Sequence, residues 1–327
     1  MIGVVKISLS GNTPTRTEEP LSVFSDFRIE KELMGKFELT LTSHNVPNNP
    51  GHSLIDVESE IIVDDFIFKI KQVSETVSYK QVTAISNFFD LNDNYVPNLI
   101  LSQNSFNTYA NFALSGTTYT FTSSVQGIRE IPNFGMTNSV ALINLICQEY
   151  GCEYEIMPNN RIHFSPQIGS VTQDQFRYAY NISSITANFD SSNLKTVIKG
   201  YGANDLMVEY VAPTAQLFGR REAEPIRDDR FTIASNLLEY ISKEIQPNPE
   251  TNIEIDIIEG SGSLGDNISL GNTVWLIHEP LGIEYQTRIY SYTQRMVKSD
   301  LIISNVQLGN TVTKTLNNIF IDNRLRR

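Results

Sequence analysis

The sequence predicts a mainly β protein with α+β insertions, built from several domains. Apolar and polar residues alternate in short stretches near both ends of the chain, for example KFELTLT at residues 36–42 and NIEIDII at residues 252–258. This alternation is typical of half-buried strands, and the Gly, Asn and Pro residues between the stretches are typical of turns. With 327 residues, 40% of them hydrophobic, the chain is long enough for roughly two to four domains.

The first 91 residues predict a compact antiparallel β-domain. Further strands are expected at residues 59–63, 66–73 and 78–85, where β-branched and aromatic residues are frequent. After Leu91 the pattern changes to a looser region, rich in Asn and Ser, that extends to residue 135. We therefore expect a domain boundary near Leu91.

The inserted region predicts a helix between Thr137 and Tyr150, followed by the strands EYEIM and RIHFS. Gly151 is placed to end the helix, because glycine adopts the left-handed conformation common just after a helix. One face of the helix is apolar and is formed by Val140, Ile143, Cys147 and Tyr150.

Residues 185–202 predict paired strands that close in a turn containing Gly200 and Gly202. A second helix is expected later, with Thr232 as its N-terminal cap and Pro247 at its end. Its apolar stripe is formed by Ala234, Leu237, Leu238, Ile241 and Ile245. Strands return from residue 252, in NIEIDII, TVWLIH, YQTRIYSYTQ and LIISNVQLG.

These patterns divide the chain into five predicted parts. Two of them are β-barrel or sandwich domains of similar strand rhythm, so a trimer of two related β-domains per chain would match a six-fold ring. The parts are a first β-domain (1–91 with 184–203), an inserted α+β domain (92–183), a charged connector with a helix (204–251), a second β-domain (252–311) and a helical C-terminal tail (312–327).

The overall charge argues against a protein that binds nucleic acid specifically. Lys and Arg number 25 against 37 Asp and Glu, which gives a net charge of −12, whereas a duplex reader needs a basic surface. No stretch approaches the ~20 consecutive apolar residues of a membrane span, and the N-terminus lacks the apolar core of a secretory signal. We expect a soluble protein made in the cytoplasm, without a membrane span.

The densest cluster of charge is residues 218–231 (FGRREAEPIRDDRF), with eight charged side chains in fourteen positions of a chain that is 19% charged. Because the two signs interleave, these side chains can form charge-assisted pairs within the segment or across a subunit contact. We expect a domain or subunit interface here, and the alternative is a solvated loop with weak surface pairs. The residues are Arg220, Arg221, Glu222, Glu224, Arg227, Asp228, Asp229 and Arg230.

Cys147, Cys152 and His163 are the candidates for a nucleophile, a base or metal ligands. Two cysteines five residues apart could bridge each other or bind metal with His163, but His44, His52 and His278 lie far from them in the sequence. A catalytic thiol also needs an exposed, electropositive setting, and Cys147 lies on the apolar face of a predicted helix. We therefore expect small buried cysteines, no catalytic residue and no metal site.

Two further motifs match a cofactor or metal pattern in letters only. Gly260, Gly262 and Gly265 form G-x-G-x-x-G, but a strand and a turn follow them, so no helix N-terminus is available for a pyrophosphate. Asp90 and the asparagines after it imitate a calcium loop, but Tyr95 occupies the position that needs glycine. No cofactor is expected.

Four segments carry a resemblance to a known family: VIKGYG at 197–202, PTAQLFGRREAEPIRDDRF at 213–231, LGNTVWLIHEPLGIEYQTRIYSY at 270–292 and QLGN at 307–310. They resemble the phage tail-hub proteins of the prophage endopeptidase tail, or tail-associated lysin, family. The likeness covers about the last 130 residues, and the first 180 match only in the order of their elements. Members often have Asp where Asn272 stands, a neutral exchange.

The resemblance implies a structural protein of a phage or prophage tail, similar in fold to the baseplate hub. In that family a trimer of two tube-like β-domains per subunit lies beneath the tail tube, and DNA passes through it without specific binding. The expected partners are the distal tail protein, the tape-measure protein and tail-tip or receptor-binding proteins. Longer members carry a lytic extension, whereas this sequence ends at Arg327 soon after the last hub strand; the alternative is a tail-associated endopeptidase or peptidoglycan hydrolase.

Overall fold

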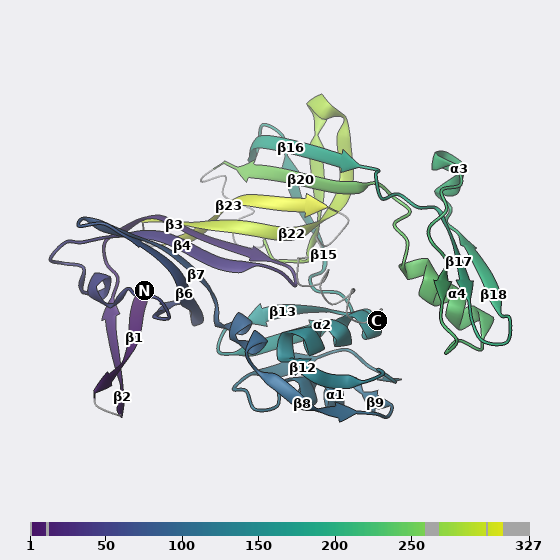
Figure 1. Ribbon diagram of the computed structural model, residues 1–327. Helices are drawn as coiled ribbons and strands as arrows, with labels where there is room; N and C mark the ends of the chain where they lie inside the picture. The colour runs from purple at the N-terminus through teal and green to yellow at the C-terminus, as the bar shows by residue number, and fades with distance from the viewer. Residues whose placement is uncertain (1, 11–12, 259–267, 299, 310–327) are drawn as a thin grey trace. The chain divides into compact units, whose positions relative to one another are not determined.

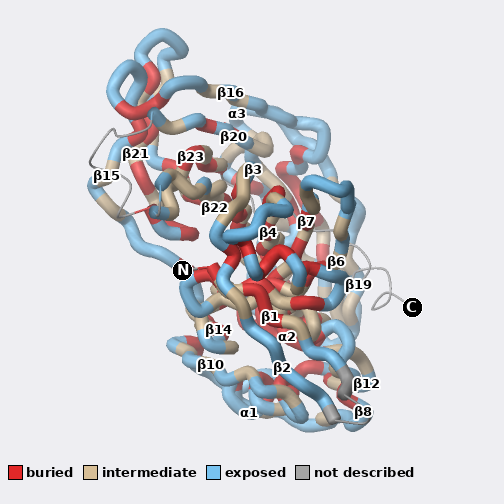
Figure 2. The backbone as a smooth tube through the Cα atoms, turned by 90° about the vertical axis from the view of Figure 1, so that its left-hand side faces the viewer, coloured by how far each residue is buried: buried red, intermediate tan, exposed pale blue. Residues whose placement is uncertain are grey.

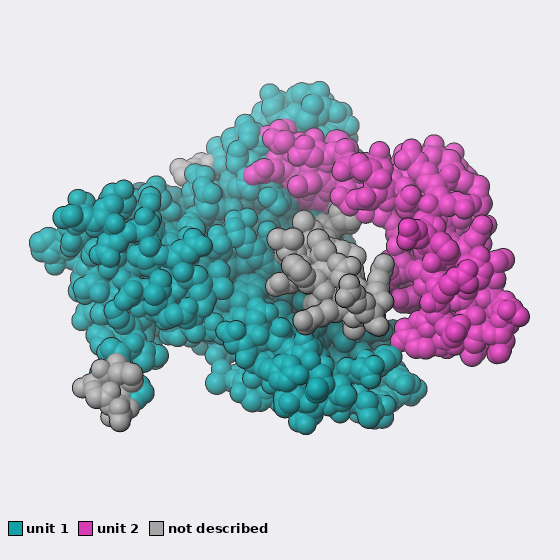
Figure 3. All heavy atoms as spheres, in the orientation of Figure 1, with its two compact units in different colours: residues 1–184, 255–307, 312–327 teal, residues 185–254, 308–311 magenta. Residues whose placement is uncertain are grey.

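The computed structural model describes residues 2–10, 13–258, 268–298 and 300–309 (Figure 1). Contacts between Cα atoms divide the chain into two compact units, shown in Figure 3. Unit 1 comprises residues 1–184, 255–307 and 312–327, and unit 2 comprises residues 185–254 and 308–311. The predicted tail at 312–327 and the glycine motif at 260–265 lie outside the described residues.

Thirteen of the described strands form one large sheet, in the order β16-β20-β23-β22-β3-β4-β7-β6-β5-β1-β2, with β21 joining β15 to β22. The predicted mainly β class is confirmed. The strands are β1 (Gly3–Ser10), β2 (Thr13–Pro20), β3 (Phe24–Glu32), β4 (Phe37–His44), β5 (Glu60–Val63), β6 (Phe66–Glu75), β7 (Tyr79–Ser86), β15 (Val171–Arg177), β16 (Ile182–Asp190), β20 (Glu250–Ile257), β21 (Thr273–His278), β22 (Ile283–Val297) and β23 (Asp300–Gly309).

The strands of the first domain bury one face and leave the other polar. Along β4, Phe37, Leu39 and Leu41 are buried and alternate with Glu38 and Thr40, as side chains of successive strand residues must. The same alternation occurs in β6 and β7, and Figure 2 shows buried positions recurring along these strands. The short helices η1 (Pro50–Leu54) and η2 (Asn87–Asn92) complete this region.

The two β-rich ends of the chain meet in the long strand β22. Its first half pairs antiparallel with β21, and residues 291–295 pair antiparallel with β3. Strands from the first 91 residues and from the last part of the chain therefore share one sheet. That the two ends are copies of one barrel stays a prediction.

The inserted region combines two helices with short strands. The predicted helix is confirmed as α2, which is capped by the Asn138 side chain and ends at Gly151, whose φ is 62°. Phe88 of η2 packs against Tyr154 with 5.5 Å between ring centroids, so this region shares a core with the first domain. Its elements are β8 (Tyr95–Ile100), β9 (Asn104–Ser105), α1 (Phe106–Ala113), β10 (Thr120–Ser123), β11 (Ile128–Arg129), β12 (Phe134–Asn138), α2 (Ser139–Tyr150), β13 (Glu153–Met157) and β14 (Arg161–Ser165).

Unit 2 contains a small three-stranded sheet, in the order β18-β17-β19, packed on helix α4, and also includes parts of β16 and β20 of the large sheet. Leu237 and Ile241 of α4 are fully buried, and Gly200 of β17 leaves room for them: a Cβ at Gly200 would lie 2.9 Å from Ile241 Cγ2. The elements are β17 (Val197–Tyr201), β18 (Met207–Val211), α3 (Ala215–Phe218), β19 (Ile226–Arg227) and α4 (Ala234–Lys243).

One detail of unit 2 differs from the expectation. The predicted cap at Thr232 is wrong, because α4 begins at Ala234 with Ile233 at the N-cap position and no side-chain cap. Residues 184–203, grouped from the sequence with the first β-domain, contribute to two sheets: β16 pairs with β20 in the large sheet, and β17 pairs with β18 and β19. The five-part division as a whole stays a prediction. None of the described helices is long and apolar enough to cross a membrane.

Candidate functional site

The charged segment of unit 2, residues 218–231, connects α3 to the start of α4 and contributes β19 to the small sheet. Its backbone is held to β17 at one end. Arg221 N–H donates to Thr196 Oγ1 at 2.8 Å, and Thr196 N–H donates to the Arg221 carbonyl at 2.9 Å. The segment is therefore a positioned loop whose side chains project from a fixed backbone.

The first group of charges surrounds Arg220. Its Nη2 donates to Glu209 Oε1 of β18 at 2.9 Å and to Glu222 Oε1 at 3.4 Å. The pKa of Glu209 is lowered, chiefly by the hydrogen bond from Arg220. All three side chains are substantially exposed to solvent, so each pair contributes little to folding stability.

The second group is a tight turn formed by Asp228 and Arg230. The Arg230 guanidinium donates twice to the carboxylate, from Nε to Oδ1 at 2.9 Å and from Nη2 to Oδ2 at 2.6 Å, and Arg230 N–H donates to Oδ1 at 3.0 Å. The hydrogen bond from Arg230 is the largest cause of the lowered pKa of Asp228. Just before this turn, the Arg227 guanidinium lies over the Tyr201 ring, 4.3 Å from its centroid.

The structure brings four of the eight predicted residues together in these two groups. Ion pairs among the described residues join Arg220 to Glu222 and Asp228 to Arg230. The side chains of Arg221, Glu224, Arg227 and Asp229 are exposed. These four project from a loop that the other four help to hold in shape.

Exposed apolar side chains that the sequence analysis missed accompany the charges in unit 2. Leu217 of α3 is 79% exposed, Ile233 before α4 is 57% exposed, and Met207 of β18 is 57% exposed. Leu217 directly precedes the charged segment. Its position next to so many charged residues was the sequence signal that could have indicated its exposure. Large apolar side chains among charged ones are common at protein contacts.

The two candidate thiols are not exposed as a catalytic cysteine must be. Cys147 and Cys152 are free thiols and both are buried. Burial is the largest cause of the raised pKa of Cys147, which disfavours the reactive thiolate. His163 lies on β14, and its Nδ1 is 2.9 Å from Thr122 Oγ1. Within the part of the chain that the structure describes, no three His, Cys, Asp or Glu side chains are arranged to hold a metal ion.

The family models that match this chain all describe the same kind of protein. Three family models match the chain in succession: the prophage endopeptidase tail N-terminal domain at residues 5–86, the prophage endopeptidase tail domain at residues 93–164 and the prophage endopeptidase tail at residues 170–319. Together they span most of the sequence. No curated protein matches the chain significantly.

Solved structures share the fold. The prophage tail protein gp18 of Listeria monocytogenes is 22% identical, with a TM-score of 0.74 over 100% of this chain and 99% of its own. A tail protein of Neisseria meningitidis is 12% identical, with a TM-score of 0.64 over 94% of this chain and 96% of its own. The E. coli c3393 protein, a type VI secretion component described as similar to the T4 tail proteins gp27 and gp5, is 8% identical, with a TM-score of 0.50 over 94% of this chain and 77% of its own.

The three family matches follow one another in the order of the β-domain, the inserted region and the remainder of the chain. The shared fold extends over the whole length of the Listeria protein. The chain therefore belongs to the prophage endopeptidase tail family and is a prophage tail protein.

Proposed function

We propose that three copies of this chain form the hub at the tail tip or baseplate, beneath the tail tube and around a channel for DNA. The observation that carries the proposal is the full-length likeness to a prophage tail protein, together with the likeness to a secretion component that itself resembles T4 tail proteins. The chain acts by contact, not by chemistry. Its neighbours in the tail are the distal tail protein, the tape-measure protein and the tail-tip or receptor-binding proteins.

The charged segment at residues 218–231 is the proposed contact surface. Four exposed charged side chains project from a backbone fixed by the Thr196 and Arg221 hydrogen bonds, and Leu217 adds apolar area beside them. A fixed loop with both signs of charge favours one orientation of a partner and disfavours others. This arrangement suits a symmetric ring, in which each copy must meet the next in the same way.

The test is the mass and the assembly of charge-reversal variants. Purified wild type at high concentration is expected to contain trimers by sedimentation, and Arg227→Glu or Asp229→Arg is expected to reduce trimers and complete tails at least about tenfold, as loss of a close charge pair across an interface does. Lys243→Glu on α4 is the control, because Lys243 is exposed and lies outside the segment. Normal assembly of both reversal variants would show that the segment is a solvated loop.

A further inference from the structure

Cys147 and Cys152, the two cysteines of the chain, meet at the C-terminal end of α2. Cys152 N–H donates to the Cys147 carbonyl at 3.0 Å, and Gly151 N–H donates to the Gln148 carbonyl at 3.3 Å. Gly151 is left-handed, with a φ of 62°. Two nested hydrogen bonds around a left-handed glycine form the Schellman motif, which ends many helices.

The Schellman motif brings the two cysteine side chains together. In this motif the residue that accepts the outer hydrogen bond and the residue that donates it commonly touch through their side chains, and Cys147 and Cys152 occupy these two positions. Burial is the largest cause of the raised pKa of the Cys147 thiol, and a hydrogen bond with the Cys152 side chain is the next. Disulfides join residues whose α-carbons are roughly 4.4–6.8 Å apart, and two residues joined by a backbone hydrogen bond are held that close.

The thiols are enclosed, but the turn between them is open to solvent. Cys147 is 3% exposed and Cys152 is 5% exposed. Gly151 is exposed, and no atom from a more distant part of the described chain lies within 4 Å of a Cβ placed on it. Helix ends open locally at a lower free energy than helix centres. Opening of this one turn therefore uncovers Cys152 while the rest of α2 stays folded.

We propose that Cys147 and Cys152 form a disulfide within one molecule when the protein meets an oxidant. The contact across the Schellman motif and the open turn support this modification site, which does not depend on the proposed hub. Because the chain has no other cysteine, a disulfide within one molecule joins these two. Glutathione and thioredoxin keep thiols reduced inside cells, so the pair oxidises after a particle has left the cell.

A small peroxide, such as hydrogen peroxide, is an oxidant that the opening of one turn admits. The Cys152 thiolate attacks one peroxide oxygen: an S–O bond forms, the O–O bond breaks, and the departing hydroxide takes up the proton that Cys152 released, giving water. The Cys147 sulfur then attacks the Cys152 sulfur, so that the S–S bond forms and the S–O bond breaks. The oxygen leaves as a second water with the Cys147 proton. The two thiols together lose two electrons, which the peroxide gains.

The disulfide fastens the end of α2 to the start of β13. Cys152 directly precedes β13, whose first residue, Glu153, pairs with Arg288 of β22. A covalent link across the turn blocks unwinding of the last turn of α2, beside this ion pair. Because the closed loop is short, the stabilisation is modest in the chain-entropy model.

The test oxidises the purified full chain and locates the product. Reduced protein is treated with hydrogen peroxide and then unfolded in N-ethylmaleimide, which blocks the remaining thiols, before its mass is measured. The wild type is expected to lose two hydrogen atoms per chain and to take up no maleimide. Cleavage after Glu149, which lies between the two cysteines, should give two peptides that stay joined until a reductant is added.

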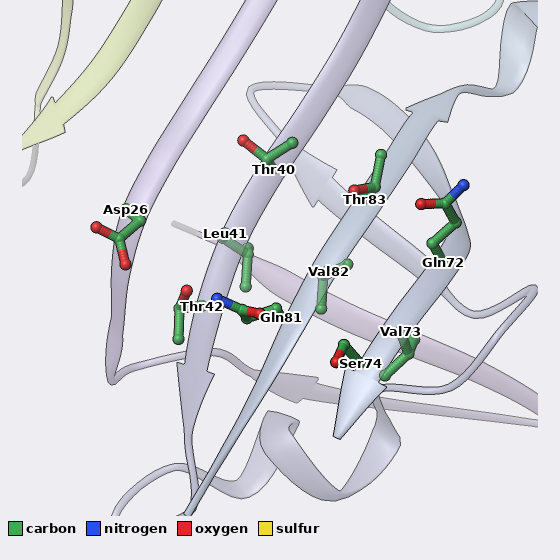
Figure 4. A pocket seen from close by; sticks show the side chains of 10 residues that line it. All are labelled: Asp26, Thr40, Leu41, Thr42, Gln72, Val73, Ser74, Gln81, Val82 and Thr83. Atoms are coloured by element: carbon green, nitrogen blue, oxygen red, sulfur yellow. The ribbon is translucent and has the colours of Figure 1, made fainter. Parts of the chain in front are cut away.

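The controls separate a disulfide from other oxidation. Cys147→Ser and Cys152→Ser should form no disulfide within one chain, and Cys147→Ala replaces the first variant if it does not fold. Gln81→Cys, in a chain with both native cysteines changed to alanine, places a single thiol on the open polar face of β7 (Figure 4). This exposed thiol should react with peroxide and end as oxygenated sulfur or as a disulfide between two chains.

The thermal unfolding midpoint of the wild type is expected to rise by about 2–4 °C on oxidation and to return on reduction. Cys147→Ser should show no such shift. Wild type that keeps both thiols free under conditions that oxidise the Gln81→Cys control would overturn the proposal. Oxygenated cysteines without an S–S bond, or disulfides between chains only, would overturn it as well.

Discussion

At the scale of single residues, the ion pair between Glu153 and Arg288 is one of two well-enclosed pairs among the described residues that join distant parts of the chain, the other being Lys31 with Glu155. Arg288 donates from both terminal nitrogens to the carboxylate, at 2.7 Å and 2.6 Å, and both side chains are about four-fifths buried. Arg288 also donates to the carbonyls of Ile168 and Gly271. The pair thus fastens β13 of the inserted region to β22 of the large sheet.

Removing one partner of this pair is expected to destabilise unit 1 strongly. Glu153→Gln or Arg288→Met leaves the other group enclosed without its counter-charge, at a cost of about 3 kcal/mol in the free energy of unfolding. The double variant should cost less than the sum of the two single ones, because it leaves no uncompensated charge. Urea denaturation of the four proteins measures this coupling, and additive losses would show that the pair acts independently.

Asp228 makes the stability of unit 2 sensitive to acid. Its pKa in the folded chain lies below the ordinary value of an aspartate, mainly because of the hydrogen bond from Arg230 and despite partial burial. A carboxylate with a lowered pKa stabilises the folded state at pH values above its pKa in the unfolded chain. This stabilisation is lost as the pH falls through its pKa in the folded chain. The stability difference between wild type and Asp228→Asn should therefore be constant above pH 5 and shrink below about pH 4.

Thermal denaturation of both proteins from pH 3 to pH 7 checks this expectation. A difference that stays constant down to pH 3 would contradict it. Lys243→Ala, which removes an exposed i,i+4 pair with Glu239, serves as the control without a buried carboxylate.

The local sequence predicted correctly whether some residues are buried, but it did not predict which distant residues contact each other. Cys147 is buried on α2 as its position on an apolar helical face predicted. Glu153 and Arg288 lie 135 positions apart, and nothing in either local pattern marks the other as its partner. Likewise Asn272 looked like a neutral family exchange, but its Oδ1 accepts the Ser170 N–H at 2.9 Å, which either Asn or Asp can do.

At the scale of elements, the packing of β17 against α4 depends on Gly200. A Cβ at this position would lie 2.9 Å from Ile241 Cγ2 and 3.1 Å from Leu237 Cδ1, both of which are buried. The sequence placed Gly200 in a closing turn, whereas it lies within β17 beneath the helix. Close approach of a helix to a strand explains a glycine there.

Gly200→Ala is therefore expected to destabilise unit 2 by about 1–3 kcal/mol through overpacking. The second variant, Gly200→Ala with Ile241→Leu, removes the branch methyl that the new Cβ would meet and should recover part of the loss. Circular dichroism during thermal denaturation measures both proteins. A wild-type melting curve for Gly200→Ala alone would show that α4 moves aside at little cost.

The existence of helix α2 and its C-terminal end were predicted correctly from the sequence. The apolar periodicity and Gly151 are local signals that depend only on residues within or next to the helix. The N-terminus of α4 was not predicted correctly. The sequence indicated Thr232 as the cap, whereas Ile233, the next residue, is at the N-cap position and makes no side-chain capping hydrogen bond. Cap preferences are worth about 1 kcal/mol and are overridden when packing decides where a helix begins.

At the scale of the whole molecule, strands at the two ends of the sequence were foreseen and their union in one sheet was not. Residues 291–295 of β22 pair with β3 across some 260 positions of sequence. Alternation predicts that a strand exists and which face is apolar, but it does not identify the strand beside it. The charged segment was foreseen from its density of charge, and its role as a contact surface remains the proposal above.

The purified chain is expected to show no hydrolysis of peptidoglycan, although the family name contains the word endopeptidase. Cys147 is enclosed, with a pKa raised mainly by burial, so its thiolate is scarce at neutral pH and inaccessible to a polymeric substrate. Zymography and turbidity loss of cell walls, with lysozyme as the positive control, measure this directly. A clear lysis band that disappears in Cys147→Ser or His163→Ala would contradict the expectation and favour the tail-associated hydrolase.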